Sequence, residues 1–177
     1  MIEGKKINLR QFRRSDLTEY YELTSRLSTI GEFWPIGLMT EVALQKQYDE
    51  DGFWGKEFGR MLITDKNDKM LGCINYFHGS PYCDGYELGY RIFRPEDRGK
   101  GFMSEAVNLF VSYFFNLKTI NRIQICTDPD NLGSKKLAEK CGFTYEGRLR
   151  GQYYFKGQYR DTDIYSLLRK EWEEMQK

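Results

Sequence analysis

The chain has 177 residues, which at about 150 residues per domain corresponds to roughly one domain. Its 27 Lys and Arg residues against 26 Asp and Glu residues leave a formal net charge of +1, which argues against a broadly basic nucleic-acid binder. Hydrophobic residues make up 40% and aromatic residues 16%, enough for a packed core and too much for a disordered chain. We therefore expect a single domain over residues 1–177.

The ends of the chain and its cysteines exclude further classes of protein. No apolar stretch follows the first lysines, so a secretory signal is not expected. The longest apolar stretch without a charge, residues 106–117, is too short to span a bilayer. The four cysteines form no C-x-x-C pair and the chain has one histidine, His78, which argues against a metal site. We expect a cytoplasmic protein with reduced cysteines, no metal, and no nucleic acid or membrane as partner.

The first half of the chain predicts two helices and four strands. Thr40 is a typical N-cap before the second helix, with Val42, Leu44 and Tyr48 as candidate buried positions. The polar residues 65–69 between two strands are typical of a hairpin turn. The expected elements are a strand at 7–12, a helix at 15–27, a loop at 31–39, a helix at 41–54, and strands at 60–64, 70–77 and 86–93.

The second half predicts two helices among three strands. After a polar loop at 94–101, apolar residues recur at helical spacing as far as residue 117; they are Ala106, Leu109, Phe110, Tyr113, Phe114 and Leu117. A strand at 122–127 follows, then a helix from Asn131 that Gly142 ends, since glycine fits a left-handed cap. Two long strands, 143–155 and 159–168, complete the chain. This order predicts an α+β (mixed α/β) fold, one sheet with helices on both faces.

Residues 94–102 lie between an expected strand and the start of the strongest helix. A helix start leaves backbone N–H groups unpaired and carries the positive end of the helix dipole, so it suits an anion. Gly99 and Gly101 let the backbone curl so that successive amides face one point. Arg98 and Lys100 add positive charge beside those amides. The pattern favours binding of a pyrophosphate.

Three glycine-rich motifs compete for this loop. A P-loop needs Gly-Lys followed by Ser or Thr, and Gly101-Phe102-Met103 does not supply it. A dinucleotide motif needs a third glycine and an acidic residue about 20 positions on, but the chain has Ser104 and residues 118–121 without an acid. The third motif is the diphosphate loop of acyl-CoA transferases, R-x-x-G-x-G/A. The segment Arg98-Gly99-Lys100-Gly101 is aligned with it, and the expected strand before the loop and helix after it are both present. The plainer alternative is that the glycines only make a tight turn.

With the loop Arg98-Gly99-Lys100-Gly101, the downstream Asn131-x-x-Ser134 and Gly142-Phe143, and the element order, the chain resembles the GNAT N-acetyltransferase superfamily over nearly its whole length. Glu87-Leu88-Gly89-Tyr90 and Tyr165-Ser166-Leu167-Leu168 make it similar to the ribosomal-protein-alanine acetyltransferase branch, which modifies protein N-terminal amines. The combination is specific for the superfamily and not for the substrate.

The resemblance implies a GNAT-like single domain with acetyl-CoA as co-substrate. Its mostly antiparallel, seven-stranded sheet would contain one parallel pair, residues 86–93 and 122–127, that forms a V-shaped split for the pantetheine arm. The diphosphate would lie on the backbone amides of the loop, with Lys135 or Lys136 near the nucleotide phosphate. The residues expected to bind acetyl-CoA are Tyr90, Ile92, Arg98, Gly99, Lys100, Gly101, Phe102, Met103 and Asn131.

Direct attack by an amine on a thioester needs a base and an acid, not an enzyme nucleophile. Cys126 and Cys141 are therefore expected to be buried apolar residues. Glu87 is the candidate general base, its alternative being a solvated or salt-bridged strand carboxylate. Many relatives have a Tyr seven residues after the Asn, where it protonates the leaving thiolate. This chain has Ala138 there, so Ser134 becomes the candidate acid, its alternative being an ordinary helix-surface hydroxyl.

The acceptor pocket is expected from the first two helices, Trp34-Pro35 and the hairpin at the end of the chain. Asp161 and Asp163 are weak candidates for holding a cationic acceptor, and His78 is a surface residue or a substrate contact. An aromatic cluster in the hairpin is expected to pack across its strands rather than to bind substrate; its members are Tyr153, Tyr154, Phe155 and Tyr159.

These features predict an acetyl-CoA-dependent N-acetyltransferase that transfers the acetyl group directly to a primary amine. The favoured acceptor is a protein N-terminal amine of the ribosomal-protein-alanine type. The alternatives are a small amine (a polyamine, amino acid or antibiotic) and a non-catalytic acyl-CoA-binding module. A homodimer is compatible with all of these.

Overall fold

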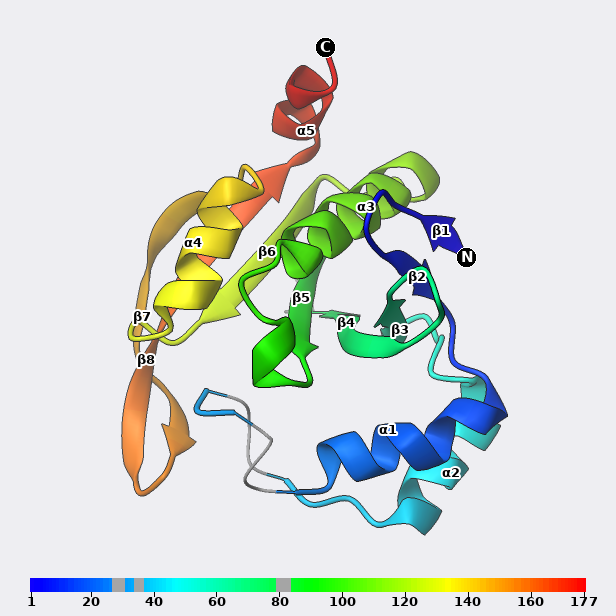
Figure 1. Cartoon of the computed structure of the whole chain (residues 1–177). Helices are drawn as coiled ribbons and strands as arrows, with labels where there is room; N and C mark the ends of the chain where they lie inside the picture. The colour runs from blue at the N-terminus through cyan, green and yellow to red at the C-terminus, as the bar shows by residue number, and fades with distance from the viewer. Residues whose placement is uncertain (27–30, 34–36, 79–83) are drawn as a thin grey trace. The chain divides into compact units, whose positions relative to one another are not determined.

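The computed structural model describes residues 1–26, 31–33, 37–78 and 84–177, and Figure 1 shows the course of the chain. Two short 3-10 helices are present, η1 (Arg14–Asp16) and η2 (Pro95–Asp97). The longer elements are β1 (Ile2–Glu3), β2 (Asn8–Arg10), α1 (Leu17–Thr24), α2 (Glu41–Asp51), β3 (Phe58–Thr64), β4 (Met70–His78), β5 (Gly85–Ile92), α3 (Phe102–Leu117), β6 (Arg122–Thr127), α4 (Leu132–Lys140), β7 (Thr144–Phe155), β8 (Gln158–Leu168) and α5 (Arg169–Met175).

The described strands form one sheet in the order β1-β2-β3-β4-β5-β6-β8-β7. β5 and β6 pair in parallel, whereas β1 with β2, β2 with β3, β6 with β8, and β7 with β8 are antiparallel. The mixed α/β fold with one parallel pair confirms the fold class predicted from sequence. The sheet has one strand more than predicted because the two-residue β1 pairs with β2 through Ile2↔Leu9 and Glu3↔Asn8.

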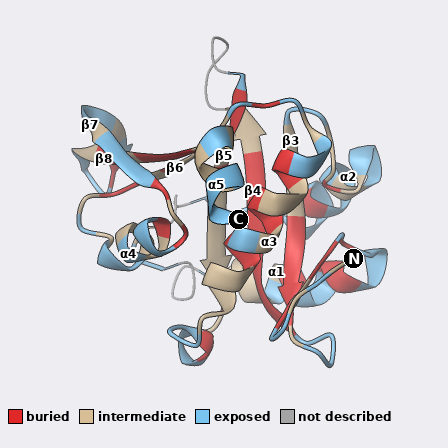
Figure 2. Cartoon of the chain, turned by 90° about the horizontal axis from the view of Figure 1, so that it is seen from above, coloured by how far each residue is buried: buried red, intermediate tan, exposed pale blue. Residues whose placement is uncertain are grey.

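The chain forms two compact units, of which the first comprises Met1–Asn75 and Tyr90–Ala106. Most of β3 and β4 is buried here and is drawn red in Figure 2. Edge-to-face aromatic contacts join Phe12 to Tyr20 and to Phe53, with ring centroids 5.0 and 5.1 Å apart, a geometry that adds to the energy of apolar burial. The core cluster consists of Phe12, Leu17, Tyr20, Leu44, Phe53, Leu62, Met70, Cys73 and Phe93.

The second unit comprises Tyr76–Gly89 and Val107–Lys177. Phe114 of α3 lies 4.8 Å from Tyr76 and 5.2 Å from Tyr86, measured between ring centroids. α5 is attached by Trp172, whose ring lies 5.4 Å from that of Phe115. Arg169 adds hydrogen bonds to the carbonyl oxygens at the end of α3 and beyond, for example to Phe115 O at 2.7 Å. Among the described residues, no helix combines the length and the apolar character needed to cross a membrane.

Several local predictions are confirmed by side-chain or backbone geometry. Thr40 caps α2, its Oγ1 accepting a hydrogen bond from Ala43 N over 3.1 Å. Asp65 Oδ1 accepts bonds from Asn67 N and Lys69 N in the β3–β4 turn, at 2.8 and 3.0 Å. The end of α4 is also as predicted, because Gly142 there has a φ of 84°.

Other local predictions are wrong for physical reasons. Val42 and Leu117 are 76% and 65% exposed, because the apolar faces of α2 and α3 are narrower than their sequence patterns. α2 ends at Asp51 rather than residue 54, since Gly52 takes the left-handed conformation with a φ of 65°. β4 extends one residue beyond the predicted strand at 70–77 and ends at His78, whose ring lies 4.7 Å from the ring of Tyr86.

Candidate active site

The segment between β5 and α3 turns twice through left-handed backbone. Arg98 N donates to Pro95 O over 3.1 Å and closes η2. Gly99 and Gly101 then have φ of 73° and 83°, a region that glycine enters without the strain that a Cβ brings. α3 begins at once, with Glu105 N donating to Gly101 O over 3.1 Å.

The backbone N–H groups of residues 99–103 make no hydrogen bond to any described residue. This row includes the first N–H groups of the 16-residue helix α3, where the helix dipole places partial positive charge. The space beside Gly99 is open, because a Cβ built there would have no described atom within 4 Å. The loop thus offers consecutive donors to an anion of diphosphate type. The loop therefore has the curled backbone with free amides that the sequence pattern predicts. Anion binding at this loop stays a prediction.

The cations around the loop differ from those expected. Lys100 Nζ is bound to Asp97 Oδ1 at 3.1 Å, and Lys69 Nζ lies 3.6 Å from Asp97 Oδ2. Burial raises the pKa of Asp97, but the hydrogen bond from Lys100 and the charge of Lys69 outweigh it, so the pKa is lowered overall. Asp97 is therefore a buried carboxylate that offsets much of the positive charge of Lys100.

Lys6, which the sequence pattern does not single out, contributes a cation to the loop. Its Nζ donates to Lys100 O over 3.2 Å and lies 3.8 Å from a Cβ built at Gly101. Its backbone N donates to Glu105 Oε1 over 3.0 Å. Arg98 is exposed on the same loop. The positive charge at the loop therefore comes from Lys6 and Arg98 more than from Lys100.

The remaining predicted acetyl-CoA contacts of the first unit lie on β5 and at the start of α3. Tyr90 and Ile92 are half-buried on β5, two residues apart and so on one face of the strand. Phe102 and Met103 are half-buried in the first turn of α3. Their backbone N–H groups belong to the unpaired row.

Glu87 is held by a neighbour in the second unit. Gln124 Nε2 donates to Glu87 Oε2 over 2.9 Å, and lies 3.7 Å from Cys126 Sγ. The parallel pairing of β5 with β6 runs from Gly85 to Glu87, whereas β6 continues to pair with β8 as far as Thr127. Glu87 therefore stands where the two parallel strands stop pairing, which is the start of the predicted split.

Cys141 is buried, as predicted, and so is Cys73, whereas Cys126 is half-buried rather than buried. Burial raises the pKa of Cys126, and the charge of Glu87 and a hydrogen bond with it raise this pKa further. Burial also raises the pKa of Cys141 to about 11 and the pKa of Cys73. Thiols with raised pKa values are protonated at neutral pH and are poor nucleophiles.

Asn131 and Ser134 are joined at the start of α4. Asn131 Oδ1 accepts a hydrogen bond from Ser134 N over 3.1 Å and so caps the helix. The side-chain amide of Asn131 makes no other hydrogen bond to a described residue, so its Nδ2 is the group left to donate to a ligand. Ser134 is half-buried in the first turn. Ala138, at the position where relatives carry a Tyr, is fully buried.

Lys135 and the two Asp candidates of the hairpin are used within the protein. Asp163 is fully buried and bound by Lys135 Nζ at 3.0 Å and by Arg148 Nε at 2.7 Å. The hydrogen bond from Arg148 lowers the pKa of Asp163, and Lys135 adds to this against the effect of burial. Asp161 accepts from Gly151 N over 2.9 Å. Lys136 is exposed.

A second polar network, missed by the sequence pattern, connects β8 to the turn before α4. Asp128 is buried and accepts a hydrogen bond from Tyr153 Oη at 2.6 Å, while Arg160 Nε lies 2.6 Å from its Oδ2. Burial raises the pKa of Tyr153 to about 12, and the bond to Asp128 contributes. The carbonyl of Asp128 also accepts from Asn131 N over 2.9 Å, so this network fixes the residue that caps α4.

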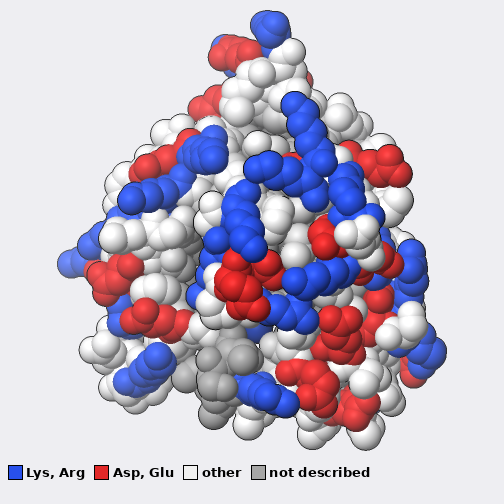
Figure 3. Space-filling view, in the orientation of Figure 1, with Lys and Arg blue, Asp and Glu red and all other residues white. Residues whose placement is uncertain are grey.

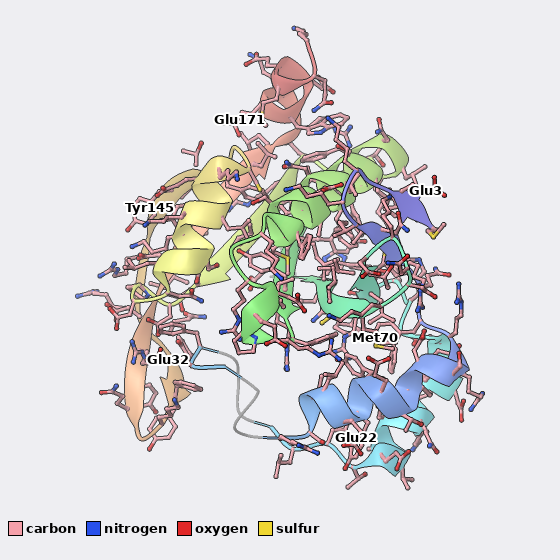
Figure 4. The ribbon with its side chains drawn as sticks, in the orientation of Figure 1. Glu3, Glu22, Glu32, Met70, Tyr145 and Glu171 are labelled. Carbon is pink, nitrogen blue, oxygen red and sulfur yellow. The ribbon has the colours of Figure 1, made fainter. Side chains whose placement is uncertain are left out.

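One pair of the predicted aromatic cluster, Tyr154 and Tyr159, packs across the β7–β8 hairpin, whereas Tyr153 and Phe155 contact each other along β7. Tyr154 and Tyr159 face each other with ring centroids 5.4 Å apart and are 64% and 75% exposed. Tyr145, labelled in Figure 4, lies 5.4 Å from Tyr165. Trp34 and Pro35, predicted to contribute to the acceptor pocket, lie outside the described residues.

Among the described residues, no group of His, Cys, Asp and Glu side chains is arranged to hold a metal ion. On the face drawn in Figure 3, basic and acidic side chains are interspersed among the coloured residues.

Comparison with known proteins supports one family. The model of the "Acetyltransferase (GNAT) domain" matches residues 6–144. The "Putative ribosomal N-acetyltransferase YdaF" of Bacillus subtilis is 38% identical over 87 residues, which are 49% of this chain and 47% of YdaF. The chain thus spans about half of that relative. Spermidine N(1)-acetyltransferase of Vibrio cholerae is 24% identical over 174 residues, 96% of each protein.

Solved structures repeat the fold. A crystal structure of spermidine N-acetyltransferase from Vibrio cholerae in complex with CoA and spermine matches with a TM-score of 0.83 and 22% identity, over 96% of this chain and 99% of that one. At this identity the likeness describes the fold and leaves the choice of acceptor open.

Proposed function

The chain belongs to the acetyltransferase (GNAT) domain family, and on this premise we propose that its acceptor is the N-terminal amine of a polypeptide. It is an N-acetyltransferase with acetyl-CoA as co-substrate. The highest identity among the relatives described above is to YdaF, a protein named for ribosomal N-acetylation. The cytoplasmic location and the single domain expected from sequence stay predictions.

The observation that carries the binding of acetyl-CoA is the row of unpaired N–H groups at residues 99–103. A diphosphate seated there would receive several charge-assisted hydrogen bonds and the field of the α3 dipole. Lys6 Nζ, fixed at the loop by Lys100 O, would add a formal charge. Asn131 Nδ2, Tyr90 and Ile92 are proposed to contact the pantetheine arm.

Glu87 is proposed as the general base. An α-amino group has a reference pKa of about 7.7–8.0, so roughly a tenth to a fifth is neutral at pH 7. Glu87 would accept a proton from the ammonium form, so that the nitrogen lone pair can attack the thioester carbonyl carbon. The Gln124 amide bound to Oε2 fixes the orientation of the carboxylate.

Ser134 is proposed as the acid. As the new C–N bond forms and the C–S bond breaks, the leaving sulfur takes a proton from the Ser134 hydroxyl. The nitrogen releases its second proton to solvent, and solvent returns a proton to Ser134. The raised pKa values of Cys73, Cys126 and Cys141 disfavour an enzyme thioester. The acetyl group is therefore proposed to move in one transfer.

A small amine is the second candidate, favoured by the likeness to spermidine N(1)-acetyltransferase over 96% of the chain. The test is free-thiol release from acetyl-CoA with peptides, spermidine, amino acids and aminoglycosides. We expect the largest kcat/KM for peptide N-termini. Faster turnover of spermidine would replace the proposal by the second candidate, and binding of acetyl-CoA without thiol release would indicate a non-catalytic module.

A further inference from the structure

The first unit contains a cavity of about 120 Å³. Its wall includes Tyr20 and Thr24 of α1, and Met39 and Leu44 at the start of α2. Two arginines complete it, Arg60 from β3 and Arg91 from β5. These are the two helices from which the sequence predicts the acceptor pocket.

Arg60 is fixed as a cation in this wall. Its Nε donates to Asn75 Oδ1 over 3.0 Å, and its guanidinium lies 5.3–5.4 Å from the ring centroids of Tyr20, Phe53 and Phe58. Within the described part of the chain, no carboxylate lies within ion-pair distance of Arg60. Its terminal N–H groups keep hydrogen-bonding capacity for a further acceptor.

Arg91 brings a second positive charge to the same cavity. Its Nη2 lies 3.4 Å from Leu23 O and its Cζ 5.4 Å from the ring centroid of Phe93. Burial lowers the pKa of Arg91; the neighbouring Cys73 and Tyr20 raise this pKa in part, and the charges of Arg60 and Arg98 lower it again. Arg60 and Arg91 thus both line this cavity.

The wall itself supplies no negative charge. No Asp or Glu is among the described residues that line the cavity. The two carboxylates of α1 are directed elsewhere, because Glu19 pairs with Arg94 at 3.3 Å and Glu22 lies 3.5 Å from Arg26. Glu22 is exposed and labelled in Figure 4.

We propose that this cavity binds the carboxylate of an acidic residue close to the N-terminus of the acceptor peptide. The planar fork of an arginine matches a carboxylate, and Met39 and Leu44 offer apolar contact to the methylenes of a Glu side chain. Arg91 follows Glu87 by four residues on β5, an even spacing that turns both side chains to one face of the strand. The inference rests on the proposed peptide acceptor and disfavours a polycation in the cavity.

Binding without turnover is the first test. Glutarate is titrated into the protein by calorimetry, with glutaramide as its neutral isostere. We expect glutarate to bind the wild-type protein and glutaramide to bind at least tenfold more weakly. Arg60→Gln and Arg91→Gln should each weaken glutarate binding at least tenfold. Arg26→Gln, a change at the exposed residue that follows the C-cap of α1, serves as the matched control and should bind like wild type.

Turnover is the second test. Tetrapeptides with Glu or Gln at position 2, 3 or 4 are compared by kcat/KM. At the preferred position we expect kcat/KM for the Glu peptide to be at least tenfold higher than for the matching Gln peptide. In the Arg60→Gln variant this ratio should fall close to one. Arg60→Lys, which keeps the charge without the fork, should give an intermediate ratio and guards against loss of folding in the first variant.

The outcomes separate the two proposals. Wild-type protein that fails to distinguish glutarate from glutaramide, and Glu peptides from Gln peptides, overturns the cavity assignment whatever the acceptor is. Glutarate binding that depends on Arg60, together with turnover of spermidine and not of peptides, overturns the peptide acceptor and leaves the cavity as an anion site.

Discussion

The side-chain amide of Gln124 donates a 2.9 Å hydrogen bond to the carboxylate of Glu87, at the last pair of the parallel strands β5 and β6. Glu87→Gln keeps the shape of this group and removes its ability to accept a proton. We expect kcat at pH 7 to fall about 10²–10⁴-fold, the usual contribution of a general base. The deficit should shrink near pH 9.5, where an α-amine is already neutral.

The measurement is thiol release across that pH range with a peptide acceptor. Gln124→Leu, which removes the donor at similar volume, should lower kcat several-fold and distort the pH profile. Gln176→Leu, an exposed change near the end of the chain, is the control. A Glu87→Gln enzyme with the wild-type rate at pH 7 would remove Glu87 as the base.

Gly101→Val tests the loop. Gly101 has a φ of 83°, where a β-branched residue is strained, and the added side chain crowds the unpaired N–H groups. We expect the affinity for CoA, measured by calorimetry, to fall at least tenfold, or about 1.4 kcal/mol. Gly52→Val carries comparable backbone strain at the end of α2, with no described atom within 4 Å of its Cβ. Equal CoA affinity in the two variants would contradict the loop assignment.

Lys6→Gln tests the cation that the structure adds to the loop. The variant loses a charge beside residues 99–103, so CoA affinity should fall about two- to fivefold, with the effect fading as salt screens the interaction. Lys5→Gln, at the adjacent and exposed position, should bind CoA like wild type. Titrations at 50 and 500 mM salt provide the comparison, and identical behaviour of the two variants would show that Lys6 has no part in binding.

Ser134→Ala tests the acid. The backbone N of Ser134, not its hydroxyl, makes the cap with Asn131, so the helix should be preserved. We expect unchanged CoA affinity with a kcat reduced at least tenfold. A wild-type kcat would leave Ser134 as an ordinary surface hydroxyl of α4.

Asp163→Asn probes stability against pH. Asp163 is fully buried, and loss of its charge leaves its two basic partners poorly satisfied, which should cost roughly 1–3 kcal/mol of unfolding free energy at pH 7. Its folded pKa lies below the ordinary value of 3.8, so this stabilisation is present above that value and is lost as the pH falls through the folded pKa. Urea unfolding at pH 7, 5 and 3 should therefore show the two proteins converging in acid.

Glu174→Gln, an exposed change on α5, should unfold like wild type at all three values. If the gap between wild-type protein and Asp163→Asn stayed constant from pH 7 to pH 3, the carboxylate would not be the source of the stabilisation.

Periodicity and turn chemistry predicted most of the fold. The strand at 122–127 agrees with β6 to the residue, because alternating apolar residues set its register. α5 was missed, since its seven residues carry one large aromatic, Trp172, and its place depends on the distant Phe115. The burial of Val42 and Leu117 was predicted wrongly, because the spacing of apolar residues does not show which part of a helix contacts the core.

In the candidate site too, features that depend on neighbouring residues could be predicted, and features that depend on distant residues could not. The glycines of the loop are a local signal and could be found from sequence. The partners of its charged groups are not local: Lys6 and Glu105, which meet at the loop, are 99 positions apart. Gln124 and Glu87 are 37 positions apart. Such pairs follow from the tertiary fold and leave no mark in a single sequence.

Asp97 forms ion pairs with both Lys69 and Lys100. These contacts fix the conformation of the loop before a ligand binds. A binding loop that already has its bound conformation needs no slow conformational change when the ligand binds. In stopped-flow measurements of CoA binding, the observed rate constant should therefore rise linearly with CoA concentration and reach no plateau. Differences in affinity among the loop variants should then appear chiefly in residence time.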